Sequence, residues 1–221
     1  MEKLRILFIG PAGAGKGTQA AKLAEEFKLE HISTGDLIRA EIKSESPLGL
    51  EVKAIVESGK LVSDEIVNAI VKNKLISSER FLLDGYPRTL EQAKFLADYS
   101  PLDYVFSMHV NKATLLERLS GRRMCTKTKD PNCKGMFHVS FNPPKENGIC
   151  DLCGSELYQR KDDNPEIIEK RLNSYEAETG EPLTKFYSNY ELAKFIEINA
   201  EASPDEVYIN ITDALKSAAK C

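Results

Sequence analysis

GPAGAGKGT, residues 10 to 18, is the stretch that decides how this chain folds. It follows an apolar run, Leu4–Ile9, that predicts a buried strand, and it precedes a helical pattern over residues 15 to 27. A strand, a glycine-rich turn, a lysine and a helix in this order are typical of a phosphate-binding loop. The glycines let backbone N–H groups turn inward around an anion, and Lys16 and the helix N-terminus add positive charge. The stretch therefore predicts a polyphosphate site.

The loop departs from the general pattern at one position. Gly17 stands where a Ser or Thr normally follows the lysine, and Thr18 comes one residue later. The displaced hydroxyl leaves the usual Mg²⁺ ligand in doubt. A turn that only joins a strand to a helix is the alternative interpretation, but the spacing of the lysine and both flanking segments favour the phosphate site.

Composition and charge exclude several classes of protein. The 221 residues are 42% hydrophobic and 29% charged, as in an ordinary globular protein. A formal net charge of −4 argues against nucleic-acid binding through a basic surface. The sequence shows no apolar signal region and no run long enough to span a membrane, so we expect a cytoplasmic protein with no membrane partner.

Apolar runs alternate with helical patterns along most of the chain. This alternation predicts an α/β fold in which helices cover both faces of a parallel central sheet. Ligands should then gather at the carboxyl ends of the strands. From Gly121 to about Arg160 the composition changes to Cys, Gly and Pro with little helical periodicity, which indicates an inserted small domain. We expect strands at residues 4–9, 31–32, 81–83, 104–110 and 194–198, and helices at 15–27, 48–57, 63–75 and 111–119, and others from about 36, 89, 165, 182 and 204.

Asp84 follows the buried strand at residues 81–83 and begins the stretch Asp84-Gly85-Tyr86-Pro87-Arg88. In phosphate-loop enzymes an acidic residue at such a strand end holds Mg²⁺, directly or through water. Arg88 can bind a phosphate through two parallel hydrogen bonds. A turn Asp and a surface Arg are the alternatives.

Further arginines lie at both ends of the inserted segment and in the next helix. Each of Arg122, Arg160 and Arg171, taken alone, is an ordinary solvated charge. We expect these three to converge on the phosphate ligand, because phosphoryl transfer relies on cations around the transferred group. No general base is required, and we expect His31, His109 and His138 to be structural.

Together these motifs resemble the adenylate kinases, and in particular those with a long lid. The likeness spans essentially the whole chain. It is carried by residues 10–18, Ser33-Thr34-Gly35-Asp36 with Arg39, residues 84–88 with Gln92, Gly121-Arg122-Arg123, residues 158–163 and Arg171-Leu172. The reaction of that family is ATP + AMP ⇌ 2 ADP with Mg²⁺.

The resemblance implies a role for each matching residue. Lys16, Asp84, Arg88, Arg122, Arg160 and Arg171 would be catalytic, with Asp84 orienting the Mg²⁺ shell. ATP would bind at Gly13, Ala14, Gly15, Lys16, Gly17, Thr18, Arg118, Arg122, Met136, Phe137 and Ala202. AMP would bind at Thr34, Arg39, Lys60, Leu61, Val62, Gly85, Arg88, Gln92, Arg160 and Arg171, with Gln92 reading the adenine edge. Asp162 and Asp163 match hinge carboxylates of the lid.

The resemblance also implies three parts. Residues 1–32, 63–120 and 164–221 would form the core, 33–62 an AMP-binding segment, and 121–163 a mobile lid. The chain departs from the family pattern at Pro11-Ala12, where the proline comes one position early, and at Ile198-Asn199-Ala200, where the third residue is usually Gly. We expect a monomer whose partners are ATP, AMP and ADP.

Four of the five cysteines fall within the inserted segment. Cys150 and Cys153 have the spacing of a metal-binding pair, and in a reducing compartment such clusters hold metal more often than disulfides. Cys125 and Cys133 are separated by seven residues, where the lids of the family have two. We expect one structural Zn²⁺ held by all four cysteines, with His138 replacing Cys125 if that residue cannot reach. A metal-free lid is the alternative.

Two other functions stay open at this point. One is a nucleoside monophosphate kinase with another base or another triphosphate donor, although Thr34 and Gln92 favour AMP by the same resemblance. The other is a nucleotide-binding or zinc-ribbon module that contacts a partner without catalysis. Such a module would not need to surround a second phosphate with arginines.

Overall fold

A five-stranded parallel sheet forms the centre of the molecule, as the alternation of strands and helices predicts. The computed structural model describes residues 3–57, 61–76 and 78–218. The strands pair in the order β2-β3-β1-β4-β8, and all four pairings are parallel. Their bounds are β1 Leu4–Ile9, β2 Glu30–Ser33, β3 Arg80–Asp84, β4 Tyr104–His109 and β8 Lys194–Asn199.

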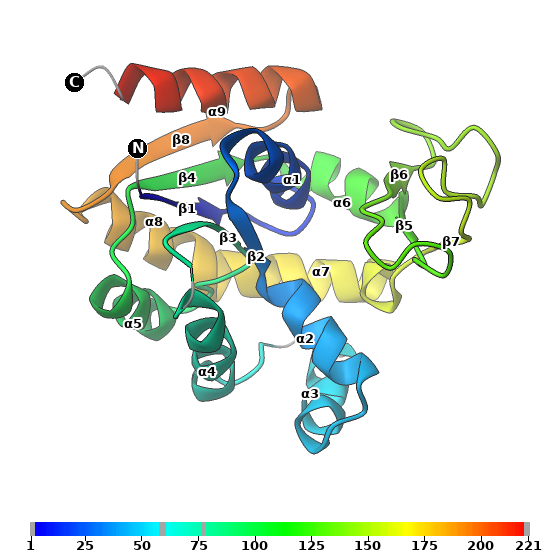
Figure 1. The fold of residues 1–221 in the computed structure, drawn as a ribbon, viewed down its shortest axis with the longest axis horizontal. Coiled ribbons are helices and arrows are strands. Elements are labelled where there is room, and N and C mark those ends of the chain that lie inside the picture. Colours follow the sequence, from blue (N-terminus) through cyan, green and yellow to red (C-terminus); the bar gives the residue numbers. More distant parts are fainter. Residues whose placement is uncertain (1–2, 58–60, 77, 219–221) are drawn as a thin grey trace.

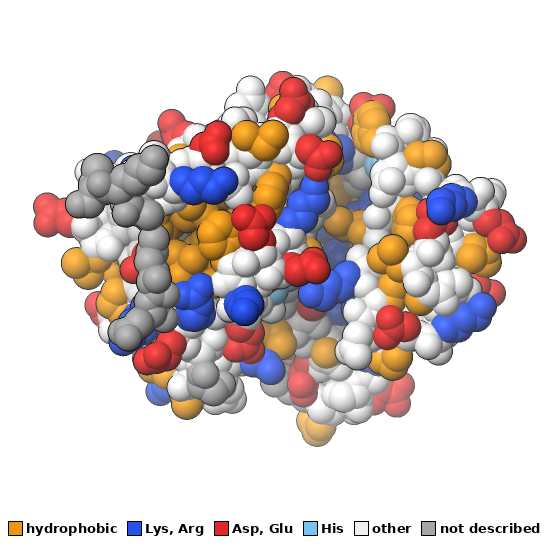
Figure 2. Space-filling model, turned by 45° about the horizontal axis from the view of Figure 1, so that its top comes forward, with side chains coloured by type: hydrophobic (Ala, Val, Ile, Leu, Met, Phe, Trp, Pro, Cys, Tyr) orange, Lys and Arg blue, Asp and Glu red, His pale blue; other side chains and the backbone are white. Residues whose placement is uncertain are grey.

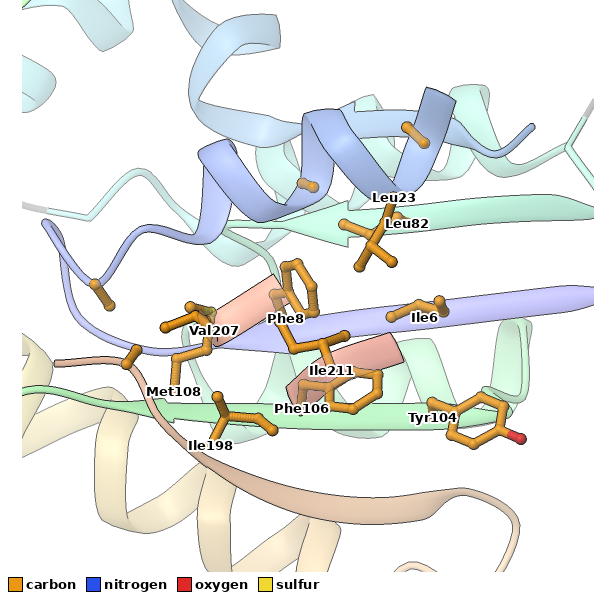
Figure 3. Close-up of a cluster of buried hydrophobic side chains, with 14 of the residues drawn as sticks. Ile6, Phe8, Leu23, Leu82, Tyr104, Phe106, Met108, Ile198, Val207 and Ile211 are labelled. Atoms are coloured by element: carbon orange, nitrogen blue, oxygen red, sulfur yellow. The ribbon is translucent and has the colours of Figure 1, made fainter. Parts of the chain in front are cut away.

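Helices cover both faces of this sheet (Figure 1). Side chains of β1 alternate between two buried clusters, with Ile6 and Phe8 on one face and Leu7 and Ile9 on the other. Figure 3 shows the first cluster, where Leu23, Val207 and Ile211 of the covering helices join the strand residues. Fully burying one such side chain stabilises the fold by about 1.5–3 kcal/mol. The first face is covered by α1 Lys16–Phe27, α6 Lys112–Ser120 and α9 Pro204–Ala218, and the second by α4 Asp64–Leu75, α5 Leu90–Tyr99 and α8 Glu181–Ser188. Helix α7 Pro165–Ser174 leads towards α8 and adds Ile168 and Leu172 to the first cluster.

Two helices, α2 Thr34–Lys43 and α3 Pro47–Glu57, form a unit that projects below the sheet in Figure 1. They pack closely because α3 carries Gly49, where an added Cβ would lie 2.2 Å from the carbonyl oxygen of Glu41. Only glycine permits this approach. The segment is therefore a compact hairpin of two helices next to the carboxyl end of the sheet.

The inserted segment contains a small antiparallel sheet, at the right in Figure 1. Its strands are β5 Arg122–Cys125, β6 Met136–His138 and β7 Leu157–Tyr158, in the order β6-β5-β7. The sequence indicates an inserted unit here but not these short strands. We call residues 121–163 the lid segment from here on; its last residues form a 3₁₀ turn, η1 Lys161–Asp163.

The helix boundaries agree with the expected caps except at two places. Ser33 Oγ accepts the N–H of Asp36 at 3.3 Å, and Ser203 and Glu206 form the expected capping box. Ser63 precedes α4, but its side chain makes no capping hydrogen bond. A π-helical turn, η2 Tyr175–Gly180, lies between α7 and α8 and was not expected. No helix in the described part of the chain is long and apolar enough to cross a membrane.

Candidate active site

The glycine-rich loop leads from β1 into α1, as predicted. Gly13 and Gly15 have φ of +85° and +92°, which side chains rarely adopt. Lys16 is the first residue of α1, and its Nζ donates to the carbonyl oxygens of Gly10 and Pro11 at 2.7 and 2.8 Å. Burial lowers the pKa of Lys16 to about 8, against the opposing charge of Asp84. The ammonium group is thus held inside the loop, where an anion would restore its ordinary pKa.

Asp84 ends β3 and lies beside the loop. A Cβ added at Gly17 would be 3.4 Å from Asp84 Oδ2, so the main chain of α1 approaches the carboxylate closely. His31 Nε2 is 3.8 Å from the same oxygen, within reach of a charge interaction but beyond a hydrogen bond. Burial acts to raise the pKa of Asp84, but the neighbouring His31, Lys16 and Arg88 outweigh it, and the pKa lies below its ordinary value. Asp84 is therefore a carboxylate, as an oxygen ligand for Mg²⁺ must be.

The segment after Asp84 brings a second group of predicted residues together. Gly85 has φ +80°, and its carbonyl oxygen accepts Thr34 Oγ1 at 2.6 Å and Arg88 Nε at 2.9 Å. The carbonyl oxygen of Arg88 accepts Thr179 Oγ1 of η2 at 2.7 Å. Burial, followed by the charge of Arg171, lowers the pKa of Arg88 to about 10. Arg88 is thus fixed on a braced turn, in a place unfavourable for its charge.

Gln92 lies in the first turn of α5 and is 2% exposed. Its Oε1 accepts the backbone N–H of Arg88 at 2.7 Å, and its Nε2 donates to Asp64 Oδ1 at 2.7 Å. Sequence reasoning missed Asp64, because a single Asp at the start of α4 reads as a helix-capping charge. The contact joins residues 28 positions apart.

The lid segment supplies two arginines, and α7 supplies a third. Arg122 donates to both carboxylate oxygens of Asp163, at 2.8 and 2.6 Å, and Asp163 is fully buried. Arg171 Nη1 lies 3.0 Å from Asp162 Oδ2 and 3.4 Å from Asp163 Oδ1. Buried arginine–carboxylate pairs of this kind hold the guanidinium planes in fixed positions. The carboxylates at the base of the lid thereby orient two of the predicted arginines.

Arg160 is held differently. Its Nε is buried and has no hydrogen-bond partner among the described residues. Burial, followed by the charges of Arg39 and Arg122, lowers its pKa to about 10. Arg39 itself pairs with Asp36 at 2.6 Å on the surface of α2. Arg39 of α2 and the arginines at the two ends of the lid segment, Arg122 and Arg160, therefore lie close enough to repel one another.

Several of the predicted cationic residues lie close to Lys16. Arg88, Arg122 and Arg171 all act to lower the pKa of Lys16. Figure 2 shows Lys and Arg side chains in the hollow between the lid segment and the rest of the molecule. This happens in a chain with a net charge of −4, so the positive field is local. An arrangement of mutually repelling cations suits a polyanionic ligand.

Other predicted nucleotide contacts lie around these residues. Arg118 donates to the carbonyl oxygens of Ala200 and Glu201 at 2.9 and 3.3 Å, beside Ala202. Met136 and Phe137 lie on β6, but Phe137 is only 7% exposed and packs with the lid cysteines. Of the remaining residues predicted to bind nucleotides, Ala14 is buried, Thr18 and Leu61 are half-buried, and Val62 is 6% exposed. Lys60 lies outside the described residues.

The four lid cysteines form one cluster. The sulfur atoms of Cys125, Cys133, Cys150 and Cys153 all lie within 4.8 Å of one another, with Cys125 and Cys153 at 3.4 Å and Cys133 and Cys150 at 3.6 Å. Tetrahedral zinc with bonds of about 2.3 Å separates its sulfur ligands by about 3.8 Å. The donor set therefore fits a closed metal site.

The surroundings of the sulfur atoms differ: burial raises the pKa of Cys125 and raises that of Cys133 to about 12. The N–H of Lys127 donates to Cys125 Sγ at 3.2 Å, and hydrogen bonds with Ser155 lower the pKa of Cys153 to about 6. Cys125 reaches the cluster despite the longer loop. His138 does not replace it, because its Nε2 lies 3.1 Å from the carbonyl oxygen of Glu117 and its Nδ1 accepts two backbone N–H groups.

The fold and the site define a phosphate-loop phosphotransferase: a parallel α/β sheet with a glycine-rich loop, an acidic strand end and converging arginines. The adenylate kinase family model matches residues 8–192. The adenylate kinase of Carboxydothermus hydrogenoformans is 46% identical over 221 residues, which cover 96% of this chain and 100% of that protein. The adenylate kinases of Bacillus subtilis and Haloarcula marismortui are each 43% identical, over 96% and 97% of this chain and 98% of those proteins. The chain belongs to the adenylate kinase family.

Proposed function

We propose that the chain catalyses the reversible transfer of a phosphoryl group from MgATP to AMP, giving two ADP. The supporting observation is the convergence of Lys16 and the arginines, which gives more positive charge than one nucleotide needs. Two phosphate chains that meet end to end would share these cations. The transferred group spreads negative charge over its oxygens, so fixed cations stabilise the transition state without covalent catalysis.

In this proposal the glycine-rich loop and Lys16 hold the ATP phosphates. Lys16 exchanges its hydrogen bonds to the loop carbonyls for the phosphate oxygens. Arg118, Met136, Phe137 and Ala202 surround the adenosine of ATP. Mg²⁺, when bound, neutralises the phosphate oxygens, and Asp84 is the residue that holds its water shell.

AMP would occupy the second half of the site. Arg39 and Arg88 hold its phosphate, and Thr34, Gly85, Gln92 and the segment 60–62 surround its adenosine. Arg122, Arg160 and Arg171 surround the transferred phosphoryl group. Residues 33–62 would then form the AMP-binding segment. These proposed roles are the ones that the resemblance to the family implies.

The lid segment would close over ATP and exclude water, which would otherwise accept the phosphoryl group. Its two stems meet where Gln159 Nε2 donates to the carbonyl oxygens of Ser120 and Asp163, both at 3.1 Å. We place the hinges at these stems, beside Gly121 and Asp162. Zn²⁺ held by the four cysteines would be structural, because four protein ligands leave no position for substrate.

A single chain would suffice for catalysis, since all these residues come from one copy, and free thiols suit a reducing cytoplasm. The test is nucleoside diphosphate formation measured with each pairing of four nucleoside triphosphates and four monophosphates. ATP with AMP should give the highest rate. A higher rate with another donor or acceptor would change the assigned substrates, and no activity with any pair would exclude the function. Light scattering then gives the oligomeric state.

A further inference from the structure

Helix α4 holds the turn that carries Arg88 and Gln92. Asp64, in its first turn, accepts Gln92 Nε2 with Oδ1 at 2.7 Å and Thr89 Oγ1 with Oδ2 at 2.9 Å. Asn68, one helical turn later, accepts the hydroxyl of Tyr86 at 2.5 Å. Both oxygens of Asp64 are therefore used within the turn, although no motif of the sequence marks this residue.

The two contacts of Gln92 determine which way its amide faces. The backbone N–H of Arg88 can only donate, so it requires Oε1. The carboxylate of Asp64 can only accept, so it requires Nε2. In the opposite orientation a donor would face a donor, and an oxygen would face a carboxylate. The amide is thus fixed although its two ends are nearly equal in shape.

We propose that Asp64 is a positioning residue that sets the base specificity of the monophosphate site by fixing the Gln92 amide. This rests on the proposed function. After its two contacts the amide keeps one N–H and one oxygen lone pair. A 6-aminopurine offers a donor at N6 beside a ring acceptor, the pattern that a glutamine amide reads with two hydrogen bonds. A 6-oxopurine offers an acceptor at O6 beside a protonated N1.

The fixed amide therefore distinguishes adenine from hypoxanthine by the order of donor and acceptor. Without Asp64 the amide could turn when a 6-oxopurine binds, at the expense of one contact with the N–H of Arg88. The contribution of Asp64 to the preference for adenine over a 6-oxopurine is then about one hydrogen bond, which corresponds to a roughly tenfold change in specificity. Asp64 acts through Gln92 and need not touch the nucleotide.

The test compares AMP with IMP as acceptor in wild-type protein and in the Asp64→Leu variant, which keeps about the same side-chain size and removes both acceptor oxygens. We expect the AMP/IMP ratio of kcat/KM to fall about tenfold. KM for AMP should rise while kcat and KM for ATP stay within about twofold. In a Gln92→Ala background the same substitution should leave the ratio unchanged. Asn68→Ala is the matched control, because it loosens the same turn without touching the amide, and it should leave the ratio as in wild type.

Equal loss of activity with AMP and IMP in Asp64→Leu would overturn the proposal, as would an unchanged ratio. If that variant does not fold, Asp64→Ala removes the same two acceptor oxygens with a smaller side chain and must shift the ratio in the same direction. No AMP-dependent activity in wild type would instead refute the proposed function. The two failures are therefore distinguishable.

Discussion

Arg160 gives a prediction in which stability and activity change in opposite directions. Its Nε is buried without a hydrogen-bond partner among the described residues, and burial, with the charges of Arg39 and Arg122, lowers its pKa from the ordinary value of an arginine to about 10. A guanidinium in such a place destabilises the folded protein. We expect Arg160→Met, which keeps the length of the side chain and removes the charge, to stabilise the fold and to abolish most of the activity.

The magnitude follows from the pKa. The difference between the two values corresponds to about 3 kcal/mol at about 1.36 kcal/mol per pH unit. Arg160 is partly exposed, and solvent screening reduces the expected gain to about 1–2 kcal/mol. Because Arg160 is a base with a lowered pKa in the folded state, the cost is complete below pH 10 and fades above it. The gain should therefore be constant between pH 6 and 9.

The assay is urea denaturation followed by circular dichroism, together with steady-state kinetics. The variant should have a higher denaturation midpoint, and kcat should fall by about 10²–10³, the usual effect of removing one charge-stabilising donor. Arg123→Met is the matched control. Among the described residues, Arg123 donates to the carbonyl oxygens of Ser120 and Arg122. Its removal should therefore change the stability by less than about 0.5 kcal/mol and change kcat little. A variant at Arg160 that is less stable than wild type would refute the reasoning.

Three other predictions concern the loop, the acceptor turn and the cysteines. The pKa of Lys16 is about 8, so its charge is lost above that pH. Calorimetry should therefore show the Kd for ATP rising about tenfold between pH 7 and 9. A Kd that does not change with pH would contradict the role assigned to Lys16. Gly85→Ala should raise KM for AMP and leave KM for ATP unchanged, because φ is +80° and the new Cβ would lie 3.1 Å from Thr34 Oγ1. An equal rise in both would argue for general misfolding. Gly135→Ala would place Cβ 2.6 Å from Cys150 Sγ, so the purified variant should contain well under one zinc per chain by elemental analysis, against about one in wild type. Full zinc in the variant would exclude the four-sulfur site, and a fully active wild-type protein without zinc would leave the metal without a role.

The parts of the fold that depend on local signals could be predicted from the sequence. The apolar run Leu4–Ile9 predicts a strand, and the glycines directly after it predict a loop. Both signals lie within a few residues of the elements that they determine. The capping box at Ser203 predicts the start of α9 for the same reason. The short strands of the lid segment could not be found, since β7 spans only Leu157–Tyr158 and no periodicity can develop over that length.

The expectations for the site follow from the sequence where ligand chemistry alone requires a residue. A polyphosphate needs cations, which was sufficient to select Arg122, Arg160 and Arg171. The residues that orient those cations and the Gln92 amide were harder to find. Asp64 acts through a contact across 28 positions, and its role depends on tertiary packing that a single sequence does not encode in any short pattern.

The most direct measurement is the amount of ADP that purified protein forms from ATP and AMP, alone and together. We predict two ADP per ATP consumed, only when both nucleotides are present, and a loss of several orders of magnitude in a Lys16→Met variant that keeps its fold. ADP formed from ATP without AMP, or near-normal activity in that variant, would contradict the shared phosphate site.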